Sequence, residues 1–522
     1  MRPALHTSAI LMFAASTACA QPQTVLITGV RVEGNTLLPE SALRELTAGV
    51  AGTEQSLAQL NALAARIQHA YRDAGYGGVV AFIPAQEETQ GHILVRVVEG
   101  RLVRVRVTGN AHFDTANVRA GLPNLREGET PRVPAIDRDI QLSNHNPAKQ
   151  VNVTLGAGSR PGDIDAEVRV TDSRPVQILA GYNNTGTGAT GRHRLSIGLV
   201  HANLFGRDHV ATLQYQTSPG HPDRVRIASA GYRVPLYARA ASIDAFVARS
   251  TVSNGTTATT AGPLSFTGRG TIAGLRANRH LGRRGEYDHY VTLGLDWRDY
   301  DDDCAIGDFG AAGCGSAAVD VNTVPLVVSY TGQKEGARLA YGVHAAVSAN
   351  GGGSAQPMFE AARPGAKRHY VLARLSGFVE KPMAAGSAIN ARLELQYSPH
   401  RLIAAEKYGI GGAGSVRGYA ERETSGDSGF LARIEVLAAA PQWGGLRLRP
   451  YLFADYGRVF NHGDMPCRAA ATSCSLRGAG LGARLAVGKS ATASIDAARA
   501  LAHGTATAKG DARAHVALQL VF

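Results

Sequence analysis

The residues best suited to a specific polar contact form the tetrapeptide Val416-Arg417-Gly418-Tyr419, inside a long glycine-rich loop at residues 399–428. A guanidinium group presents its N–H donors in a planar fork, which pairs with a carboxylate through two charge-assisted hydrogen bonds. A simple pore has little need of an arginine at the tip of so long a loop. We therefore treat this segment as the candidate functional motif; the alternative is an ordinary turn on the surface.

Sequence patterns typical of catalysis are missing from the chain. Serine, histidine and aspartate are plentiful, yet there is no G-x-S-x-G nucleophile elbow and no H-E-x-x-H motif. We accordingly expect no enzymatic activity, no catalytic residues, no cofactor and no metal.

The spacing of the five cysteines predicts disulfides if the chain is exported to an oxidising compartment. Cys19 lies near the N-terminus, and the other four form two local pairs, Cys304 with Cys314 and Cys467 with Cys474. Close pairs in loops are typical of disulfides that tie a loop back on itself. A metal site would need more ligands at tight spacing, and no His-Cys cluster accompanies either pair. We therefore expect two loop disulfides.

The first twenty residues predict a secretory signal peptide. Arg2 is followed by an apolar stretch at residues 9–15 and by the small-x-small cleavage pattern Ala18-Cys19-Ala20. A lipoprotein signal at Cys19 is the alternative, but the residues ahead of it lack the usual leucine. We expect cleavage after residue 20, so that the mature chain begins near Gln21.

Composition favours a membrane β-barrel. The chain of 522 residues is too long for one ordinary domain, and no later stretch reaches the ~20 continuous apolar residues of a membrane helix. It has 61 glycines and only 18% charged residues, which suits a barrel whose apolar residues alternate with polar ones. The net charge of +12 could indicate nucleic acid, but no basic run with interleaved aromatic residues occurs. We expect no nucleic-acid partner.

Residues 21–173 contain two copies of one pattern, each predicting an α+β module of order β-α-α-β-β. In the first copy, residues 21–100, the opening strand ends at the turn signal Gly34-Asn35. In the second copy, residues 101–173, it ends at Gly109-Asn110. The expected elements of the first copy are strands 25–33, 79–84 and 92–99 and helices 39–48 and 57–74; those of the second are strands 102–108, 151–155 and 164–171 and helices 114–120 and 135–144.

Residues 174–522 alternate between apolar and polar side chains, which predicts an antiparallel barrel of roughly sixteen strands. One example is the alternation of Ile389, Ala391 and Leu393 with charged residues between them; another ends the chain at Phe522. The connections alternate in length as bacterial barrels require, with long outer loops and short periplasmic turns. The expected outer loops are 250–268, 300–320, 350–367, 399–428 and 460–474, and the expected turns include 203–207, 235–239 and 382–387.

The neighbourhood of the tetrapeptide carries a resemblance to a known family. Tyr408-Gly409-Ile410-Gly411-Gly412 precedes it, and the strand Leu452-Phe453-Ala454-Asp455-Tyr456-Gly457 follows; Asn203-Leu204-Phe205-Gly206 opens the barrel region. This combination resembles the transporter component of two-partner secretion (type V), the haemolysin secretion/activation proteins, which share a superfamily with the barrel-assembly protein BamA. The two modules resemble tandem POTRA domains, so the resemblance covers essentially the whole mature chain.

The resemblance implies a function and a set of partners. An outer-membrane transporter of this kind passes one large unfolded exoprotein, a haemolysin, adhesin or toxin with an N-terminal secretion domain, out of the cell without ATP. Its POTRA domains lie in the periplasm, where a sheet edge receives the client by β-augmentation. Outer-membrane lipid, lipopolysaccharide and the barrel-assembly machinery are further implied partners. The alternatives are a BamA-like assembly factor and, more distantly, a passive porin.

The resemblance also implies roles for individual residues. The loop at 399–428 folds inward through the lumen, and Arg417 pairs with the inward-facing Asp455 of the F-x-D-x-G strand, which ends at Gly457. Gly418 permits a tight backbone, and Tyr419 packs or hydrogen-bonds against the wall. Phe522 is the C-terminal signal for barrel assembly.

One departure from the family concerns the start of the chain. Well-described members carry a plug helix before the first POTRA domain, whereas only residues 21–24 separate the predicted cleavage site from the first strand here. We therefore expect the inserted loop to contribute more to closing the pore.

Overall fold

The computed structural model describes residues 24–86, 91–188, 190–252, 255–266, 269–301, 319–463, 465–468 and 471–522. The predicted signal peptide, residues 1–20, lies outside these residues. The chain divides into two compact units, one of Met1–Arg104, Glu127–Val133 and Gly156–Asp165 and one of Val105–Arg126, Pro134–Leu155 and Ala166–Phe522. In the described part of the chain, no helix is long and apolar enough to cross a membrane.

One of the two predicted disulfides also falls outside the described residues. Cys304 lies outside them, and so does Cys314. The disulfide expected between these two cysteines therefore stays a prediction, in contrast to the pair Cys467 and Cys474, which the structure describes.

The first module has the predicted helices, but its first strand is divided. Its elements are β1 (Thr24–Ile27), β2 (Gly29–Glu33), α1 (Glu40–Thr47), β3 (Thr53–Ser56), α2 (Leu57–Asp73), β4 (Val79–Phe82) and β5 (His92–Glu99). The prediction of a single strand at 25–33 is wrong because β1 pairs with β3, whereas β2 pairs with β5 in the sheet β2-β5-β4. The short β3 was not predicted. Helix α2 starts at a capping box formed by Ser56 and Gln59 and buries its apolar face.

The second module follows the predicted order. Its elements are β6 (Arg101–Thr108), α3 (Thr115–Ala120), α4 (Val133–Ser143), β7 (Lys149–Ala157) and β8 (Asp163–Asp172). The sheet order is β6-β8-β7.

The two Gly-Asn turns share one device, a carboxylate that accepts hydrogen bonds from the backbone just after the turn. Glu99 Oε1 accepts from the amides of Thr36 and Leu37 at 2.7 and 3.0 Å. Asp172 Oδ2 accepts from the amides of three successive residues, Ala111, His112 and Phe113, at 3.0, 2.8 and 2.9 Å. Each carboxylate satisfies backbone amides that would otherwise lack a hydrogen-bond acceptor, and it thereby fixes the turn of its own module.

The pKa of both carboxyls is lowered, which makes the turns pH-dependent. Partial burial alone would raise each pKa, but hydrogen bonds, led by Thr36 for Glu99 and by His112 for Asp172, hold both below their usual values. A carboxyl whose pKa is lower in the folded state stabilises the fold above the unfolded pKa of ~4. That contribution is lost as the pH falls through the folded pKa.

We expect Asp172→Asn to speed hydrogen exchange of the amides of residues 111–113 at pH 7, because an amide oxygen is a weaker acceptor than a carboxylate. As the pH falls through the lowered pKa of Asp172, the wild-type carboxyl is protonated too, so the difference between the two proteins should shrink. Exchange of the full chain at each pH, followed by mass spectrometry, measures this. Glu167→Gln on the exposed side of β8 is the matched control. A variant that exchanged like the wild type at pH 7 would contradict the prediction.

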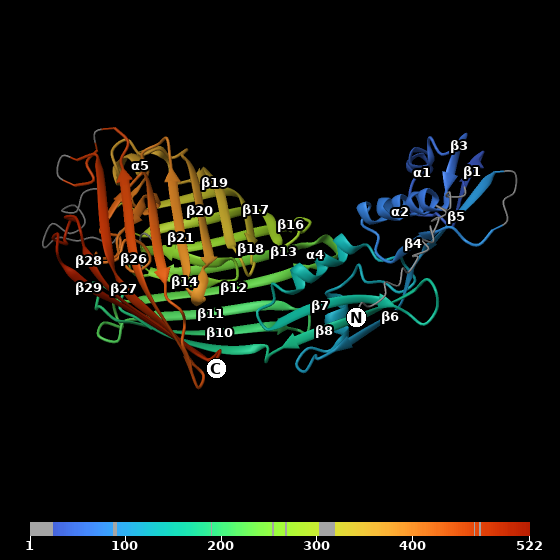
Figure 1. Cartoon of the computed structure of the whole chain (residues 1–522). Coiled ribbons are helices and arrows are strands. Elements are labelled where there is room, and N and C mark those ends of the chain that lie inside the picture. Colours follow the sequence, from blue (N-terminus) through green and yellow to red (C-terminus); the bar gives the residue numbers. More distant parts are fainter. Residues whose placement is uncertain are drawn as a thin grey trace, which may run out of the picture. The chain divides into compact units, whose positions relative to one another are not determined.

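The barrel closes with sixteen strands, as predicted. The labelled barrel strands, such as β10 to β13 and β26 to β29, lie side by side in Figure 1. They are β9 (Val176–Asn183), β10 (Arg194–Leu204), β11 (His209–Thr217), β12 (Arg226–Leu236), β13 (Ala241–Ser250), β16 (Arg269–His280), β17 (Tyr287–Asp301), β18 (Val321–Lys334), β19 (Ala340–Gly353), β20 (Val371–Pro382), β21 (Ala388–Tyr397), β24 (Ser428–Leu437), β26 (Leu446–Phe460), β27 (Ser473–Val487), β28 (Ala491–Ala500) and β29 (Ala512–Val521). A two-residue strand, β25 (Gln442–Trp443), pairs beside β26.

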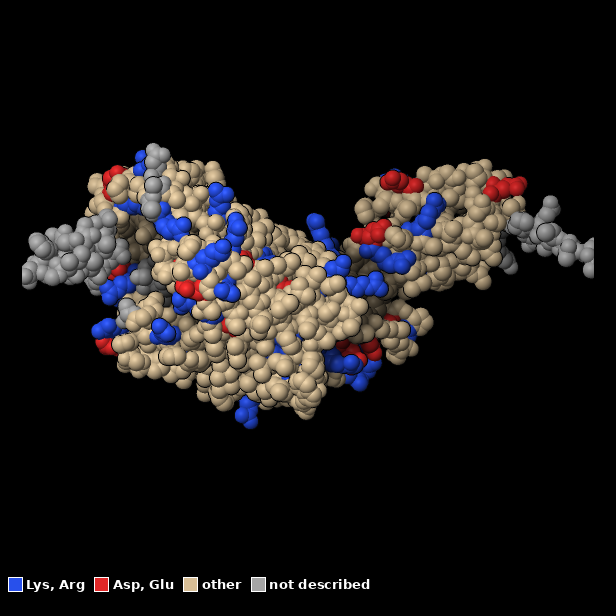
Figure 2. Space-filling view, turned by 60° about the vertical axis from the view of Figure 1, so that its left-hand side comes forward, with Lys and Arg blue, Asp and Glu red and all other residues tan. Residues whose placement is uncertain are grey.

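Alternation along these strands separates a lipid-facing surface from a polar lumen. Leu393, Ile434 and Leu452 are exposed on the outside, whereas Glu435 and Asp455 are buried on the inside. Figure 2 shows a broad stretch of barrel surface without charged side chains. A surface of that kind suits contact with hydrocarbon.

Several connections carry structure of their own. The loop after β13 contains the hairpin β14 (Gly255–Thr259) and β15 (Gly262–Phe266), and the loop after β19 contains α5 (Gln356–Ala362). Within residues 399–428, β22 (Tyr408–Ile410) pairs with β23 (Thr424–Gly426) and follows the short helix η4 (Ala404–Glu406). The turn between β12 and β13 holds η1 (Tyr237–Arg239).

Candidate functional site

The structure brings Arg417 and Asp455 together. Arg417 donates from Nε and Nη2 to the two carboxylate oxygens of Asp455 at 2.7 and 2.8 Å, and its own amide donates to Asp455 at 3.1 Å. Both residues are buried, and the Arg417 side chain is only 1% exposed. Asp455 lies in the middle of β26 with its side chain toward the lumen, so loop 399–428 reaches the interior wall. The contact has the planar, bidentate form that arginine and carboxylate favour.

Two further carboxylates complete the contact, and the sequence analysis missed them. Arg417 Nη1 donates to Glu435 of β24 at 2.9 Å and to Asp496 of β28 at 3.1 Å. The guanidinium also lies 3.5 Å from the ring centroid of Phe453. The alternation that places Glu435 and Asp496 on the luminal side was available in the sequence. Their proximity to Arg417 was not, because it depends on how the strands are staggered.

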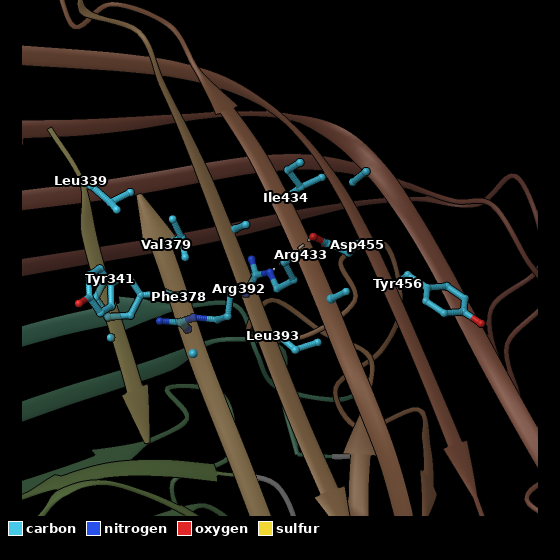
Figure 3. Close-up of a pocket in the computed structure, with 15 residues that line it drawn as sticks. Leu339, Tyr341, Phe378, Val379, Arg392, Leu393, Arg433, Ile434, Asp455 and Tyr456 are labelled. Carbon is cyan, nitrogen blue, oxygen red and sulfur yellow. Dashed lines mark ion pairs between the residues drawn. The ribbon is translucent and has the colours of Figure 1, made fainter. Parts of the chain in front are cut away.

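A second arginine lies at the edge of this cluster. Arg433 on β24 is directly opposite Asp455 in the strand register and approaches it at 3.5 Å. Figure 3 shows Arg433 beside Asp455, with Arg392 nearby. Three carboxylates therefore surround Arg417. Arg433 supplies a second positive charge that partly balances the excess negative charge of the cluster.

Small residues allow the loop to lie against the wall. Gly418 has φ +96°, a conformation that favours glycine, and a Cβ there would meet backbone atoms of Arg499 and Ala500 at 3.1 Å. A Cβ on Gly457 would press on Val416 and Ile410 at 3.0–3.1 Å. The glycine of the F-x-D-x-G strand therefore leaves room for the loop.

The two flanking side chains of the tetrapeptide fix its position. Val416 and Tyr419 are fully buried in a cluster with apolar residues of β24, β26 and β27. The Tyr419 hydroxyl lies 2.8 Å from the carbonyls of both Arg477 and Ala502, so its one hydrogen can be donated to either, and it accepts from the Ala502 amide. The Gly418 amide donates to His515 of β29. The tip therefore contacts the strands nearest the C-terminus.

The base of the loop is held by two ion pairs and by hydrogen bonds to Glu423, which the sequence analysis also missed. Arg363, just after α5, pairs with Asp427, and both are buried. Arg298 of β17 donates from Nη1 to both carboxylate oxygens of Glu406 at 2.8 and 3.0 Å. Glu423 accepts from the amides of Ala506 and Thr507 in the last outer loop. These partners are separated by up to 108 residues in sequence, so no local pattern joins them.

The outer loop expected at 250–268 also reaches the lumen, which the sequence did not indicate. The hydroxyls of Ser229 in β12 and Thr257 in β14 lie 2.6 Å apart. The Ala258 amide donates to Gln214 of β11, and Arg233 donates to the Thr260 carbonyl, each at 2.5 Å. The hairpin β14–β15 is therefore attached to the inner wall.

The Asn203–Asp208 turn forms a buried joint with the second module. Lys149, at the start of β7, forms an ion pair with Asp208, and the two side chains are 0% and 1% exposed. Lys149 also donates to Asn117 at 3.0 Å, and the Tyr237 hydroxyl donates to Asp208 at 2.6 Å. Asn117 in turn donates to Asn203. The residues 203–206 quoted for the family resemblance thus form one side of this joint.

The remaining predicted residues lie at the two ends of the barrel. Cys467 in the outer loop forms a disulfide with Cys474 at the start of β27, with a Cα–Cα distance of 6.2 Å, so the bond ties the loop to a barrel strand. Phe522 is 71% exposed on the lipid-facing side. Its amide donates to the Ile178 carbonyl at 2.9 Å, and the Ile178 amide donates back at 3.1 Å, which joins the last residue to the first strand of the barrel.

Comparison with known proteins gives a consistent result. The model of the haemolysin secretion/activation proteins ShlB/FhaC/HecB matches residues 162–485, and that of ShlB-type POTRA domains matches residues 25–100. The outer membrane transporter CdiB of Dickeya dadantii is 25% identical over 474 residues, which cover 88% of this chain and 79% of that protein. The heme/hemopexin transporter protein HuxB of Haemophilus influenzae is 26% identical over 156 residues, or 30% of this chain and 28% of that one.

Solved structures share the fold. CdiB from Escherichia coli superposes with a TM-score of 0.78 at 19% identity, covering 98% of this chain and 93% of that one. CdiB from Acinetobacter baumannii gives a TM-score of 0.69 at 16% identity, covering 96% and 91% of the two chains.

Proposed function

The chain belongs to the haemolysin secretion/activation protein family ShlB/FhaC/HecB, and from this premise we propose that it secretes one large exoprotein, received unfolded in the periplasm, through its barrel. Members are outer-membrane transporters of two-partner secretion with periplasmic POTRA domains. The observation that carries the proposal is the loop clamped inside the lumen. A porin needs no internal loop held by Arg417 against three carboxylates, whereas a transporter needs an internal element that holds the pore in one state and can be released.

The first module offers an edge for the client. In the sheet β2-β5-β4, strand β4 pairs only with β5 among the described strands, so its other side is a sheet edge. Val80 and Phe82 of β4 are 49% and 40% exposed. An extended client segment that pairs with β4 would gain backbone hydrogen bonds and contact these two side chains, which requires no particular client sequence. We propose β4 as the docking edge.

Secretion in a reconstituted strain tests the function. The chain is co-expressed with a large exoprotein from the same genome that carries an N-terminal secretion domain, and that exoprotein is quantified in the culture medium. Secretion that depends on the chain supports the transporter. If the barrel folds and the client is made but stays in the periplasm, the assembly-factor alternative gains. In that case outer-membrane porin levels should fall when the chain is removed.

The hairpin β14–β15 is a second internal element, and we expect locking it to the wall to block secretion. The Ser229 and Thr257 hydroxyl oxygens are 2.6 Å apart, so two cysteines placed there can form a disulfide. Secretion by Ser229→Cys/Thr257→Cys should be lost under oxidising conditions and restored by reductant. Each single cysteine variant is the control, under the same reductant. Full secretion by the oxidised double variant would mean that the client passes without moving the hairpin.

A further inference from the structure

A cavity in the lumen has charged side chains of one sign only. Its volume is about 700 Å³, and its walls are β9–β11 on one side and β26–β29 on the other, with Ala258 of the hairpin between them. Among the described residues that line it, the charged ones are Arg447, Arg449 and Arg484. The other polar residues of its lining are serine, threonine, asparagine, glutamine and tyrosine. We call this cavity the basic chamber.

Two arginines of the basic chamber have N–H donors that lack a hydrogen-bond acceptor among the described residues. Arg449 approaches Glu380 only at 3.8 Å, and its buried Nε has no hydrogen-bond partner among the described residues. Arg447 is exposed to the cavity, and no described acidic residue pairs with it. Arg484 is already bound to Glu435 and lies over the ring of Tyr451. A buried donor without a partner calls for a ligand or water.

A second cavity of the lumen differs in its charge balance. Its volume is about 820 Å³, and its arginines lie among four carboxylates, including Asp296 and Glu406. There, Arg276 and Arg298 pair with Asp296, and Arg298 also pairs with Glu406. Four of the six cationic side chains that line this cavity form ion pairs, whereas among the described residues of the basic chamber only Arg484 has a carboxylate within hydrogen-bond distance.

We propose that the basic chamber binds carboxylate side chains of an acidic, extended segment of the exported chain as it passes through the barrel. The inference rests on the proposed function and adds a preferred client chemistry to it. Walls of low dielectric concentrate the field of the arginines, so a carboxylate is attracted more strongly here than on the open surface. The Arg447 guanidinium and the unpartnered Nε of Arg449 provide charge-assisted contacts to such carboxylates.

Binding of a fluorescent polyglutamate peptide to the purified full chain in detergent tests this proposal. We expect saturable binding by the wild type and at least about tenfold weaker binding by Arg447→Gln/Arg449→Gln, because two charge-assisted contacts are lost. A polylysine peptide should not bind in the chamber. Heat-modifiable migration on a gel verifies that each variant barrel is folded.

The matched control removes the same charge outside the barrel. Arg31→Gln/Arg169→Gln changes two side chains that are 77% and 73% exposed. It should bind polyglutamate like the wild type. Equal weakening in both double variants, or no binding by the wild type, would overturn the proposal. Polyglutamate binding as expected in a chain that secretes nothing would instead overturn the proposed function and leave the basic chamber in place.

Discussion

Replacing Arg417 with alanine is expected to lower the amount of secreted client at least about tenfold while the barrel stays folded. The side chain makes four hydrogen bonds to three carboxylates inside the barrel, and its removal takes all of them away. Asp455, Glu435 and Asp496 would then face one another with less compensating charge. Removing one partner from a buried ion pair costs about 3–5 kcal/mol, since the other charge stays buried without compensation.

The loss should act on the loop rather than on the barrel. The sixteen strands keep their backbone pairing without Arg417. The tip then loses its side-chain ion pairs and keeps the apolar cluster of Val416 and Tyr419, the Tyr419 hydroxyl contacts and the backbone hydrogen bonds to Asp455 and His515. Arg417→Lys should give an intermediate result, because an ammonium group cannot make a bidentate contact with Asp455 and also reach two other carboxylates.

Secreted client in the medium, at equal barrel abundance, is the main measurement. Trypsin cleavage after Arg422 reports release of the loop separately from secretion. Arg458→Ala, near the outer end of the strand that carries Asp455, is the matched control and should secrete normally. Wild-type secretion by Arg417→Ala would keep the transporter assignment and remove the role given to this arginine.

The second large effect is expected at the joint between Lys149 and Asp208. Lys149→Met leaves Asp208 fully buried with only the Tyr237 hydroxyl and no positive charge, which should destabilise the joint by about 3–5 kcal/mol. The double variant Lys149→Met/Asp208→Asn removes both charges and should recover part of the loss. A double-mutant cycle with these variants and Asp208→Asn therefore gives the interaction energy of the Lys149–Asp208 pair, apart from the contacts each residue makes with other groups.

The exchange rate of the backbone amides of α3 and α4, measured in the full chain, reports the stability of the joint. Lys149→Met should exchange faster in both helices than the wild type and the double variant. Secretion should fall in the same order if α3 and α4 must stay attached to the barrel. Lys407→Met, in the inserted loop, removes a lysine elsewhere and should leave α3 and α4 protected. Unchanged protection in Lys149→Met would show that packing alone holds the joint.

Secondary structure and its repetition were largely available from the sequence, since they depend on local patterns. Helix α2 and strand β5 lie within one residue of their predicted bounds because a 3.6-residue apolar period and a run of β-branched residues are local signals. The division of the first strand was missed because it depends on which partner each half finds: β3 for β1, and β5 for β2.

The sequence by itself determined the class of molecule: two α+β modules, an antiparallel barrel with an even number of strands, and an arginine loop with Asp455 on the luminal side. Successive side chains of a β-strand point to opposite faces of the sheet, so the alternation of apolar and polar residues indicates which side chains face the lumen. Only the tertiary structure decided that Glu435 and Asp496 join Arg417, that Glu406 and Asp427 hold the base of the loop, and that the hairpin β14–β15 enters the lumen. Those contacts depend on the stagger between strands and on the path of long loops, and both are set by the closed barrel rather than by neighbouring residues in the chain.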